Sequence, residues 1–209
     1  MTYPTQAPTA PSALFFDLGG VILTNGWDRV CRRQVIDQLG LDWEEFADRH
    51  DFVAHDFEIG RISLAHYLER TIFYRPREFS AEDFTAAMFA ASTNLPGSLQ
   101  LLADLAVTGI LLVTLNNESR ELNEHRIDRF GLHRYFKVFL SSCYLGVKKP
   151  ELEIYRLALD VIQRPAAECL FVDDRDLNLE CARDVGLPGI RFESADQLRS
   201  ELVARGILA

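Results

Sequence analysis

Residues 168–186, ECLFVDDRDLNLECARDVG, carry the pattern that decides the fold. The run CLFV is apolar enough for a strand buried on both faces, and it ends at two aspartates, Asp173 and Asp174. From about residue 176 to residue 185 the apolar spacing becomes helical. A buried strand followed directly by an amphipathic helix is part of a βαβ unit, so this stretch predicts a parallel sheet.

Other apolar runs repeat this pattern on both sides. They are ALFFDL at 13–18, GILLVTL at 109–115, FKVFLSS at 136–142 and LPGIRF at 187–192. Helical spacing fills the segments at roughly 118–130, 151–163 and 195–205. Strand and helix in alternation predict an α/β fold, a Rossmann-like parallel sheet flanked by helices.

The gap between the first two strands, almost a hundred residues, is much longer than a crossover connection needs. It contains helical patterns at 28–41, 43–58, 63–74 and 80–92. We therefore predict an inserted all-helical domain over residues 24–94 and a core domain formed by 13–23 and 95–209. Residues 1–12 hold three prolines and no apolar periodicity, which predicts a flexible tail.

Composition narrows the possible partners and the compartment. The chain has 22 Lys and Arg against 31 Asp and Glu, a net charge of -9, and no basic run, so we expect no nucleic-acid partner. Its apolar stretches are far shorter than the ~20 residues of a membrane-spanning helix, and its start lacks the pattern of a signal peptide. We therefore expect no membrane partner and a cytoplasmic location. The oligomeric state leaves no signal in the sequence.

The cysteines give no sign of a metal site or a disulfide framework. There are four, and they form no CxxC pair and have no histidine at a zinc-ligand spacing. This pattern favours reduced, mostly buried thiols.

Polar side chains follow the predicted strands where a ligand site is expected, because open parallel sheets bind ligands beyond the carboxyl ends of their strands. Asp17 ends the first strand, Asn116 and Asn117 follow the second after Leu115, and Lys148 and Lys149 lie in the loop after the third. Singly, such residues are often turn residues, helix caps or solvated surface charges.

Together with Asp173 and Asp174, Asp17 places three carboxylates at one edge of the predicted sheet. Two like charges about 4 Å apart repel by roughly 4 kcal/mol at an effective dielectric constant of 20, so a cation is needed among them. Oxygen ligands with open positions for water and a phosphate suit Mg²⁺ best, which makes Mg²⁺ the expected cofactor.

The same stretches resemble a known family. FFDLGGVIL at 15–23, LLVTLNN at 111–117, GVKKPELEIY at 146–155 and LFVDDRDLNLECARDVG at 170–186 are together similar to the four ordered motifs of the haloacid dehalogenase-like hydrolase superfamily. The resemblance is strongest to its phosphatase branch, which carries a helical C1-type cap after the first motif. It spans about residues 13–193 and offers an explanation for the inserted helices, as a cap over the site.

The resemblance implies a mechanism and a set of site residues. Asp17 would attack a phosphomonoester and form an aspartyl-phosphate that water hydrolyses, while Lys149 would neutralise the phosphoryl oxygens. The Mg²⁺ ligands would be Asp17, Asp173, Asp174 and the backbone carbonyl of Gly19. The expected substrate is a small phosphorylated metabolite, with sugar phosphates as one candidate class.

Two positions depart from the family pattern. Gly19 stands where most family phosphatases have a second aspartate, the general acid and base. Leu115 aligns with a serine or threonine that binds the phosphoryl group. Thr114 is one residue away and faces the opposite way unless a bulge shifts the register, so Thr114, Asn116 and Asn117 are the candidate substrate-binding residues.

Histidines of the predicted cap are candidates for the missing acid, because the pKa of histidine lies near neutrality. These are His50, His55 and His66, and His55 is favoured because it precedes FEIGRIS, a segment similar to a recurrent cap segment. A histidine on a small helical domain is more often a surface or packing residue.

Three functions remain open. The preferred one is a Mg²⁺-dependent phosphatase. A 2-haloacid dehalogenase would use an equivalent aspartate without a metal, and the Asp173–Asp174 pair argues against it. A catalytically weak metal- or phosphate-binding regulatory protein would account for Gly19 and Leu115.

Overall fold

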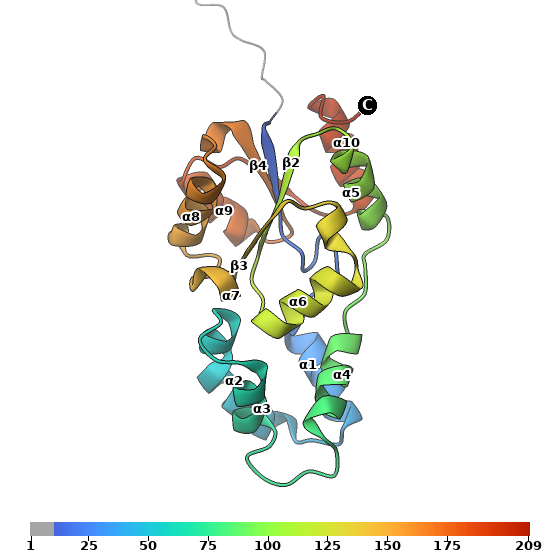
Figure 1. Cartoon of the computed structure of the whole chain (residues 1–209), viewed down its shortest axis with the longest axis vertical. Coiled ribbons are helices and arrows are strands. Elements are labelled where there is room, and N and C mark those ends of the chain that lie inside the picture. Colours follow the sequence, from blue (N-terminus) through green and yellow to red (C-terminus); the bar gives the residue numbers. More distant parts are fainter. Residues whose placement is uncertain (1–10) are drawn as a thin grey trace, which may run out of the picture.

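A parallel sheet forms the centre of the molecule (Figure 1). The structure is a computed structural model, and it describes residues 11–209; the first ten residues of the predicted tail lie outside it. The sheet has five strands in the order β3-β2-β1-β4-β5, and all its pairs are parallel. The strands are β1 (Ala13–Phe16), β2 (Leu111–Asn116), β3 (Val138–Ser141), β4 (Cys169–Asp173) and β5 (Gly189–Arg191).

Helices cover both faces of the sheet, as predicted for a Rossmann-like fold (Figure 1). Helices α5 and α10 pack on one face, and α8 and α9 pack on the other. Their bounds are α5 (Ser98–Ala106), α10 (Ala195–Ala204), α8 (Leu152–Ile162) and α9 (Asp176–Asp184). The predicted α/β fold class is confirmed.

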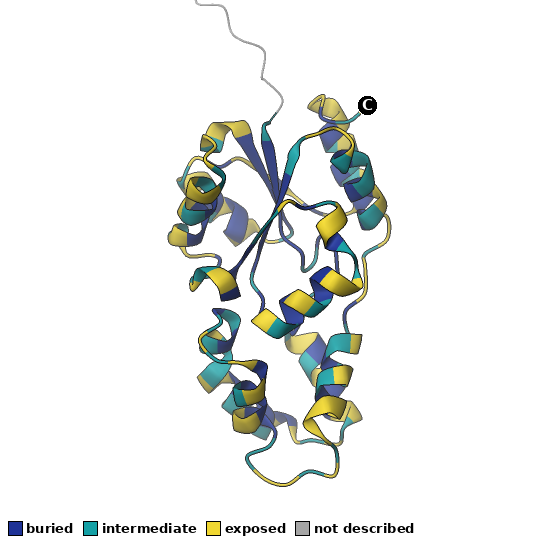
Figure 2. Ribbon diagram, in the orientation of Figure 1, coloured by how far each residue is buried: buried dark blue, intermediate teal, exposed yellow. Residues whose placement is uncertain are grey.

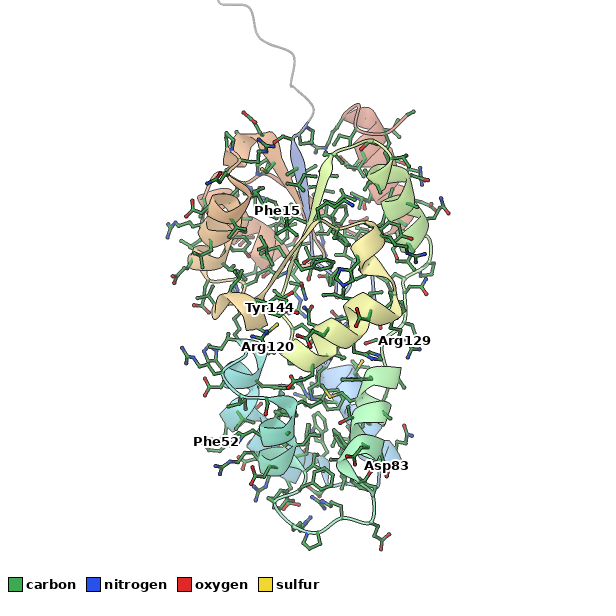
Figure 3. The ribbon with its side chains drawn as sticks, in the orientation of Figure 1. Phe15, Phe52, Asp83, Arg120, Arg129 and Tyr144 are labelled. Carbon is green, nitrogen blue, oxygen red and sulfur yellow. The ribbon has the colours of Figure 1, made fainter. Side chains whose placement is uncertain are left out.

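The side chains of β1 show how one strand serves both layers. Leu14 and Phe16 belong to the apolar cluster on the α5 face, and Ala13 and Phe15 belong to the cluster on the α8 face. Successive side chains of a strand point to opposite faces, and all four residues are fully buried, so β1 is the central strand of the core. Figures 2 and 3 show the buried strands and Phe15 among them.

A helical insertion follows β1 and has an apolar core of its own, which includes Trp27, Phe46, Tyr67 and Phe84. Its helices are α1 (Arg29–Gln38), α2 (Trp43–Glu58), α3 (Leu64–Thr71) and α4 (Ala81–Ala90). Each begins where a side-chain oxygen accepts a hydrogen bond from a first-turn N–H, the caps being Asp28, Asp42, Ser63 and Ser80. The helices coincide with the patterns predicted from the sequence.

The insertion lies beyond the carboxyl ends of the strands, where α6 (Arg120–Arg129) and α7 (Ser142–Leu145) meet it (Figure 1). Arg120 and Tyr144 mark this junction in Figure 3. Gly60 has φ of 73°, and a Cβ there would lie 2.3 Å from the Cys143 carbonyl oxygen, so only glycine fits this contact. The backbone N–H of Leu64 donates to Glu121 Oε1 at 2.8 Å. The insertion is therefore held over the edge of the sheet where the polar residues gather.

Some details differ from the sequence-based expectations. Strand β2 extends to Asn116, one residue beyond the predicted end, and the short helix α7 was not expected.

All four cysteines are free, and three of them are buried. Within residues 11–209, no helix combines the length and the apolar character that crossing a membrane requires.

Candidate active site

The order of the strands in the sheet determines where the site lies. The chain runs from β1 outward to β2 and β3 and then crosses back to β4 on the other side of β1, so the winding direction reverses between β1 and β4. Phe16 of β1 pairs in register with Val172 of β4. The residues that follow, Asp17 and Asp173, therefore emerge side by side at the carboxyl edge.

Lys149 joins these two carboxylates. Its Nζ lies 3.0 Å from Asp17 Oδ2 and 2.6 Å from Asp173 Oδ2, and its side chain is almost completely buried. Asn117 fixes the backbone of Lys149: its Oδ1 accepts from the Lys149 N–H at 2.9 Å, and its Nδ2 donates to the Lys149 carbonyl at 2.8 Å. The loop after β3 thus delivers one ammonium group between two strand ends.

The remaining oxygens of both carboxylates also have fixed donors. The Leu18 N–H donates to Asp17 Oδ1 at 2.7 Å. Asp173 accepts from Asn178 Nδ2 at 2.9 and 3.1 Å and from the Arg175 N–H at 2.9 Å. Because these donors lock both rotamers, the free space beside the carboxylates has a defined shape.

A third carboxylate, Asp174, makes the cluster fit a cation. Asp17, Asp173 and Asp174 each offer one oxygen within 4.8 Å of the others. Asp174 Oδ1 is buried and has no hydrogen-bond partner, an orphaned acceptor that a cation would satisfy. Gly20 has φ of 77° and lies against the Asp174 side chain, so that a Cβ on Gly20 would be 2.4 Å from Asp174 Oδ2. Oxygen donors of this kind suit Mg²⁺.

Burial and mutual repulsion tune the ionisation of these groups. Burial raises the pKa of Asp17 to about 6; Asp173 and Asp174 add to this effect and Lys149 opposes it. Burial and the Asp173 charge raise the pKa of Asp174. Burial alone would lower the pKa of Lys149, but the two carboxylates beside it outweigh burial and raise it. Lys149 therefore stays positively charged, and its single charge does not balance the carboxylates around it.

A cavity of about 490 Å³ opens above this cluster, which is within the usual size range for small-molecule sites. Asp17, Asn117 and Lys149 lie on its core side. The insertion contributes Trp27, Arg32, His50 and Phe57, so the cavity lies between the two parts of the molecule.

The structure brings most of the predicted site residues together. Asp17, Gly19, Asn117 and Lys149 line the cavity, and Asp173 and Asp174 complete the carboxylate cluster.

Thr114 and Asn116, predicted to bind substrate, are not among the cavity-lining residues. Thr114 Oγ1 accepts from the Leu140 N–H at 3.2 Å, and Asn116 is hydrogen-bonded to Asn123 and Ser141. Because β2 continues through Asn116, Thr114 and Asn116 share one face of the strand and point into the protein.

Of the candidate histidines, only His50 lines the cavity. His55, which the sequence favours, is exposed on α2, and His66 lies near Glu69 on α3. The preference for His55 therefore has no support in the geometry.

A buried ion pair was missed by the sequence analysis. Arg126 Nη1 donates to Glu118 Oε2 at 2.9 Å, and Arg126 Nη2 donates to the Thr24 carbonyl at 2.5 Å. Burial raises the pKa of Glu118 to about 7, against the effect of Arg126. Both residues line the cavity. No sequence motif identifies two charged residues eight positions apart as partners, so the sequence alone could not reveal this ion pair.

Residues 11–186 match the family model described as haloacid dehalogenase-like hydrolase. The chain belongs to this family. It is 31% identical over 159 residues to flavin mononucleotide hydrolase 1 of Arabidopsis thaliana, covering 76% of this chain and 64% of that protein. It is 29% identical over 198 residues to the sesquiterpene phosphatase AstK of Aspergillus oryzae, covering 88% and 91%. It is also 35% identical over 131 residues to bifunctional epoxide hydrolase 2 of Rattus norvegicus, covering 59% of this chain and 23% of that protein.

Solved structures of haloacid dehalogenase-like proteins share the fold. An enzyme of the family from Bacteroides thetaiotaomicron superposes with a TM-score of 0.79 at 20% identity, covering 93% of this chain and 99% of that one. The same enzyme in complex with magnesium and inorganic phosphate gives a TM-score of 0.74 at 21% identity, covering 88% and 96%.

Proposed function

We propose that this chain is a Mg²⁺-dependent phosphatase that hydrolyses a small phosphomonoester, with Asp17 as the nucleophile. The observation that carries the proposal is the buried Asp17 carboxylate, which lies beside Lys149 and two further carboxylates at the floor of a cavity. The phosphatase and hydrolase names of two relatives, and the magnesium and phosphate bound by a fold neighbour, are consistent with it.

The first half of the reaction transfers the phosphoryl group to Asp17. A carboxylate oxygen of Asp17 attacks phosphorus in line with the ester bond, and that bond breaks to release the alkoxide, which takes a proton from water. Lys149 Nζ, 3.0 Å from Asp17 Oδ2, places a positive charge where the phosphoryl oxygens arrive. Asn117 holds the lysine backbone, so this charge is positioned before substrate binds.

The second half returns the enzyme to its starting state. Water attacks the aspartyl-phosphate, inorganic phosphate leaves, and the Asp17 carboxylate is restored. Mg²⁺ held by Asp17, Asp173, Asp174 and the Gly19 carbonyl would supply positive charge that offsets the phosphoryl negative charge. We propose that the helical insertion over residues 24–94 acts as the cap, because its side chains close the cavity above Asp17.

Hydrolysis of p-nitrophenyl phosphate tests this function. We expect turnover with Mg²⁺, none after chelation, and none in Asp17→Asn, whose side chain has nearly the same volume and leaves the circular dichroism spectrum unchanged. Undiminished activity in excess EDTA would contradict the metal requirement. Metal-independent release of chloride from 2-chloropropionate would indicate a dehalogenase instead, and phosphate binding without turnover would indicate a regulatory protein.

A further inference from the structure

The wall of the cavity contributed by α1 and α2 presents hydrogen-bond donors that the proposed phosphoryl chemistry does not use. Its polar residues include His50 of α2 and Arg32 of α1. Neither residue belongs to the carboxylate cluster or contacts Lys149 in the ion pairs and hydrogen bonds of residues 11–209.

A hydrogen-bond relay fixes the tautomer of His50. Trp27 Nε1–H donates to the Tyr67 hydroxyl oxygen at 2.8 Å, and the same hydroxyl lies 2.8 Å from His50 Nδ1. Tyr67 is fully buried, so its hydroxyl proton needs an acceptor, and His50 Nδ1 lies at hydrogen-bond distance for that role. The hydroxyl proton therefore goes to Nδ1, and the ring carries its own proton on Nε2.

Because His50 lines the cavity and its Nδ1 is held by Tyr67, Nε2–H is the polar group of the ring that can face the cavity. Nε2 has no hydrogen-bond partner in the described part of the chain and is not sealed in the protein interior. Burial and the nearby positive charges of Arg32 and Lys148 lower the pKa of His50 to about 4, against the effect of Asp51. His50 is thus a hydrogen-bond donor at neutral pH and has no extra proton to give as a general acid.

Arg32 adds an uncompensated positive charge to the same wall. Its Nη1 donates to the Trp27 carbonyl, while its Nε is buried without a partner. Among residues 11–209 no carboxylate lies within ion-pair distance of Arg32. Two cations that line the cavity from the core side are paired, Lys148 with Glu58 at 2.7 Å and Arg126 with Glu118 at 2.9 Å. Arg29 of α1 also lines the cavity, but it is exposed and its guanidinium lies over the Trp43 ring.

We propose that His50 and Arg32 bind the leaving group and select phosphomonoesters that carry a second anionic oxygen group, a carboxylate or a second phosphate. This inference rests on the proposed phosphatase function. Both residues offer only donors, and a guanidinium matches the geometry of either anion. An apolar leaving group would displace water from these donors without accepting their hydrogen bonds, and this loss costs binding energy.

Matched substrates test the selection. For linkers of two, three and six carbons, we compare the alkyl phosphate with the ω-carboxyalkyl phosphate and the bisphosphate. At the linker length that spans the cavity, we expect kcat/KM to be about tenfold or more higher for an anionic substrate than for its alkyl match, because charged hydrogen bonds are involved. Comparison of the two anionic series identifies which anion is preferred.

Variants assign the preference to these residues. We expect Arg32→Met to remove it and His50→Phe to reduce it several-fold, whereas Arg33→Met, on the exposed neighbour paired with Asp37, retains it. Equal kcat/KM across the series, or a preference that survives Arg32→Met, would overturn the inference. Hydrolysis of p-nitrophenyl phosphate in the same preparations keeps the two proposals separate: without it the phosphatase proposal itself fails.

Long-range ¹H–¹⁵N NMR tests the His50 state without turnover. We expect a neutral His50 ring with its proton on Nε2 between pH 5.5 and 8 in the parent, and loss of the single tautomer in Tyr67→Phe. A proton on Nδ1 in the parent would overturn the inference.

Discussion

Lys148 and Lys149 are adjacent in the chain, but their side chains serve different parts of the molecule. Lys149 is buried between Asp17 and Asp173, whereas Lys148 is half-exposed and pairs with Glu58 of the insertion. We predict that Lys149→Ala lowers kcat on p-nitrophenyl phosphate by 10²-fold or more, about the effect of losing one preorganised charge-stabilising group. Lys148→Ala is the matched control, with an expected change below about tenfold. Equal losses would mean that Lys149 has no special role, and thermal melts of both variants control for stability.

In the proposed reaction, Gly19 supplies no acid beside the leaving group, and no histidine of the insertion takes that role. His50 is neutral and His55 is exposed outside the cavity. Gly19 does not have a positive φ, and a Cβ there would lie 3.2 Å from Asn25 Oδ1, so a side chain needs only a small shift of Asn25. We predict that Gly19→Asp raises kcat on an alkyl phosphate by up to about 10²-fold, within the range of general acid catalysis.

An aryl phosphate should respond much less to Gly19→Asp, because its leaving group departs readily as an anion. Gly19→Asn has a similar shape without a proton to give, and it should show no gain. The measurement is kcat on both substrates for the three proteins. A gain of equal size on the alkyl and aryl phosphates would argue against proton donation.

The buried His50 also makes stability depend on pH. Its pKa is about 4 in the folded protein and 6.5 in an exposed histidine, so the unfolded chain binds a proton first as the pH falls. The contribution of His50 is fully present above pH 6.5 and is lost as the pH falls to about 4, by up to about 3 kcal/mol. Urea titrations give the free energy of unfolding of the parent and of His50→Gln, and the difference between these two values should change as the pH falls. A difference that is constant from pH 7 to pH 4 would rule out the buried neutral ring.

Residue-level prediction from the sequence worked where one general rule applied. Carboxyl ends of parallel strands meet at one edge, so the convergence of Asp17, Asp173 and Lys149 followed from the strand pattern. The rule gave no help with Thr114 and Asn116, because a strand end shifted by one residue decides which side chain faces the site.

At the scale of elements, the Glu118–Arg126 pair ties helix α6 to the segment that enters the insertion. Arg126 bonds to the Thr24 carbonyl, and a Cβ on Gly26 would lie 1.9 Å from Glu118 Oε2. We predict that Arg126→Met destabilises the protein by about 3–5 kcal/mol, because it leaves the Glu118 carboxylate buried without a partner. Urea unfolding at pH 8, above the raised pKa of Glu118, measures the loss.

A double-mutant cycle separates this pair from general packing. Arg126→Met combined with Glu118→Gln should cost less than the sum of the single changes, since the second change removes the unpaired charge. Arg33→Met breaks an exposed pair with Asp37 and should cost below about 0.5 kcal/mol. Additive losses in the cycle would show that the two charges are not coupled.

Element boundaries in the insertion were readable from the sequence, and their arrangement was not. The apolar spacing and the acidic or serine caps define α2 and α4 locally. Which face of α2 turns to the site depends on the packing of Trp27, Phe46 and Tyr67 around it, which is set by tertiary contacts. For this reason His50, and not His55, reaches the cavity.

At the scale of the whole molecule, we expect the carboxylate cluster to be a point of weakness in the absence of a bound cation. The chain carries a net charge of -9, and a single buried ammonium group faces the three clustered carboxylates. A cation that binds the folded state and not the unfolded chain stabilises the fold by mass action, about 2.7 kcal/mol at a concentration 100 times its Kd. Since α5, α8, α9 and α10 pack on the sheet whose strand ends hold these carboxylates, this gain should appear in global unfolding.

We therefore predict that Mg²⁺ raises Tm of the EDTA-treated protein by about 5–10 °C at saturating concentration, since 1 kcal/mol shifts Tm by about 2–4 °C in a domain of this size. Sodium chloride at the same ionic strength controls for general screening and should give a much smaller shift. Asp174→Asn removes the negative charge of one proposed ligand. It should therefore raise Tm in EDTA and reduce the further gain from Mg²⁺. Differential scanning calorimetry measures both effects without any substrate. A Mg²⁺ response of the same size in the parent and in Asp174→Asn would show that the ion binds elsewhere.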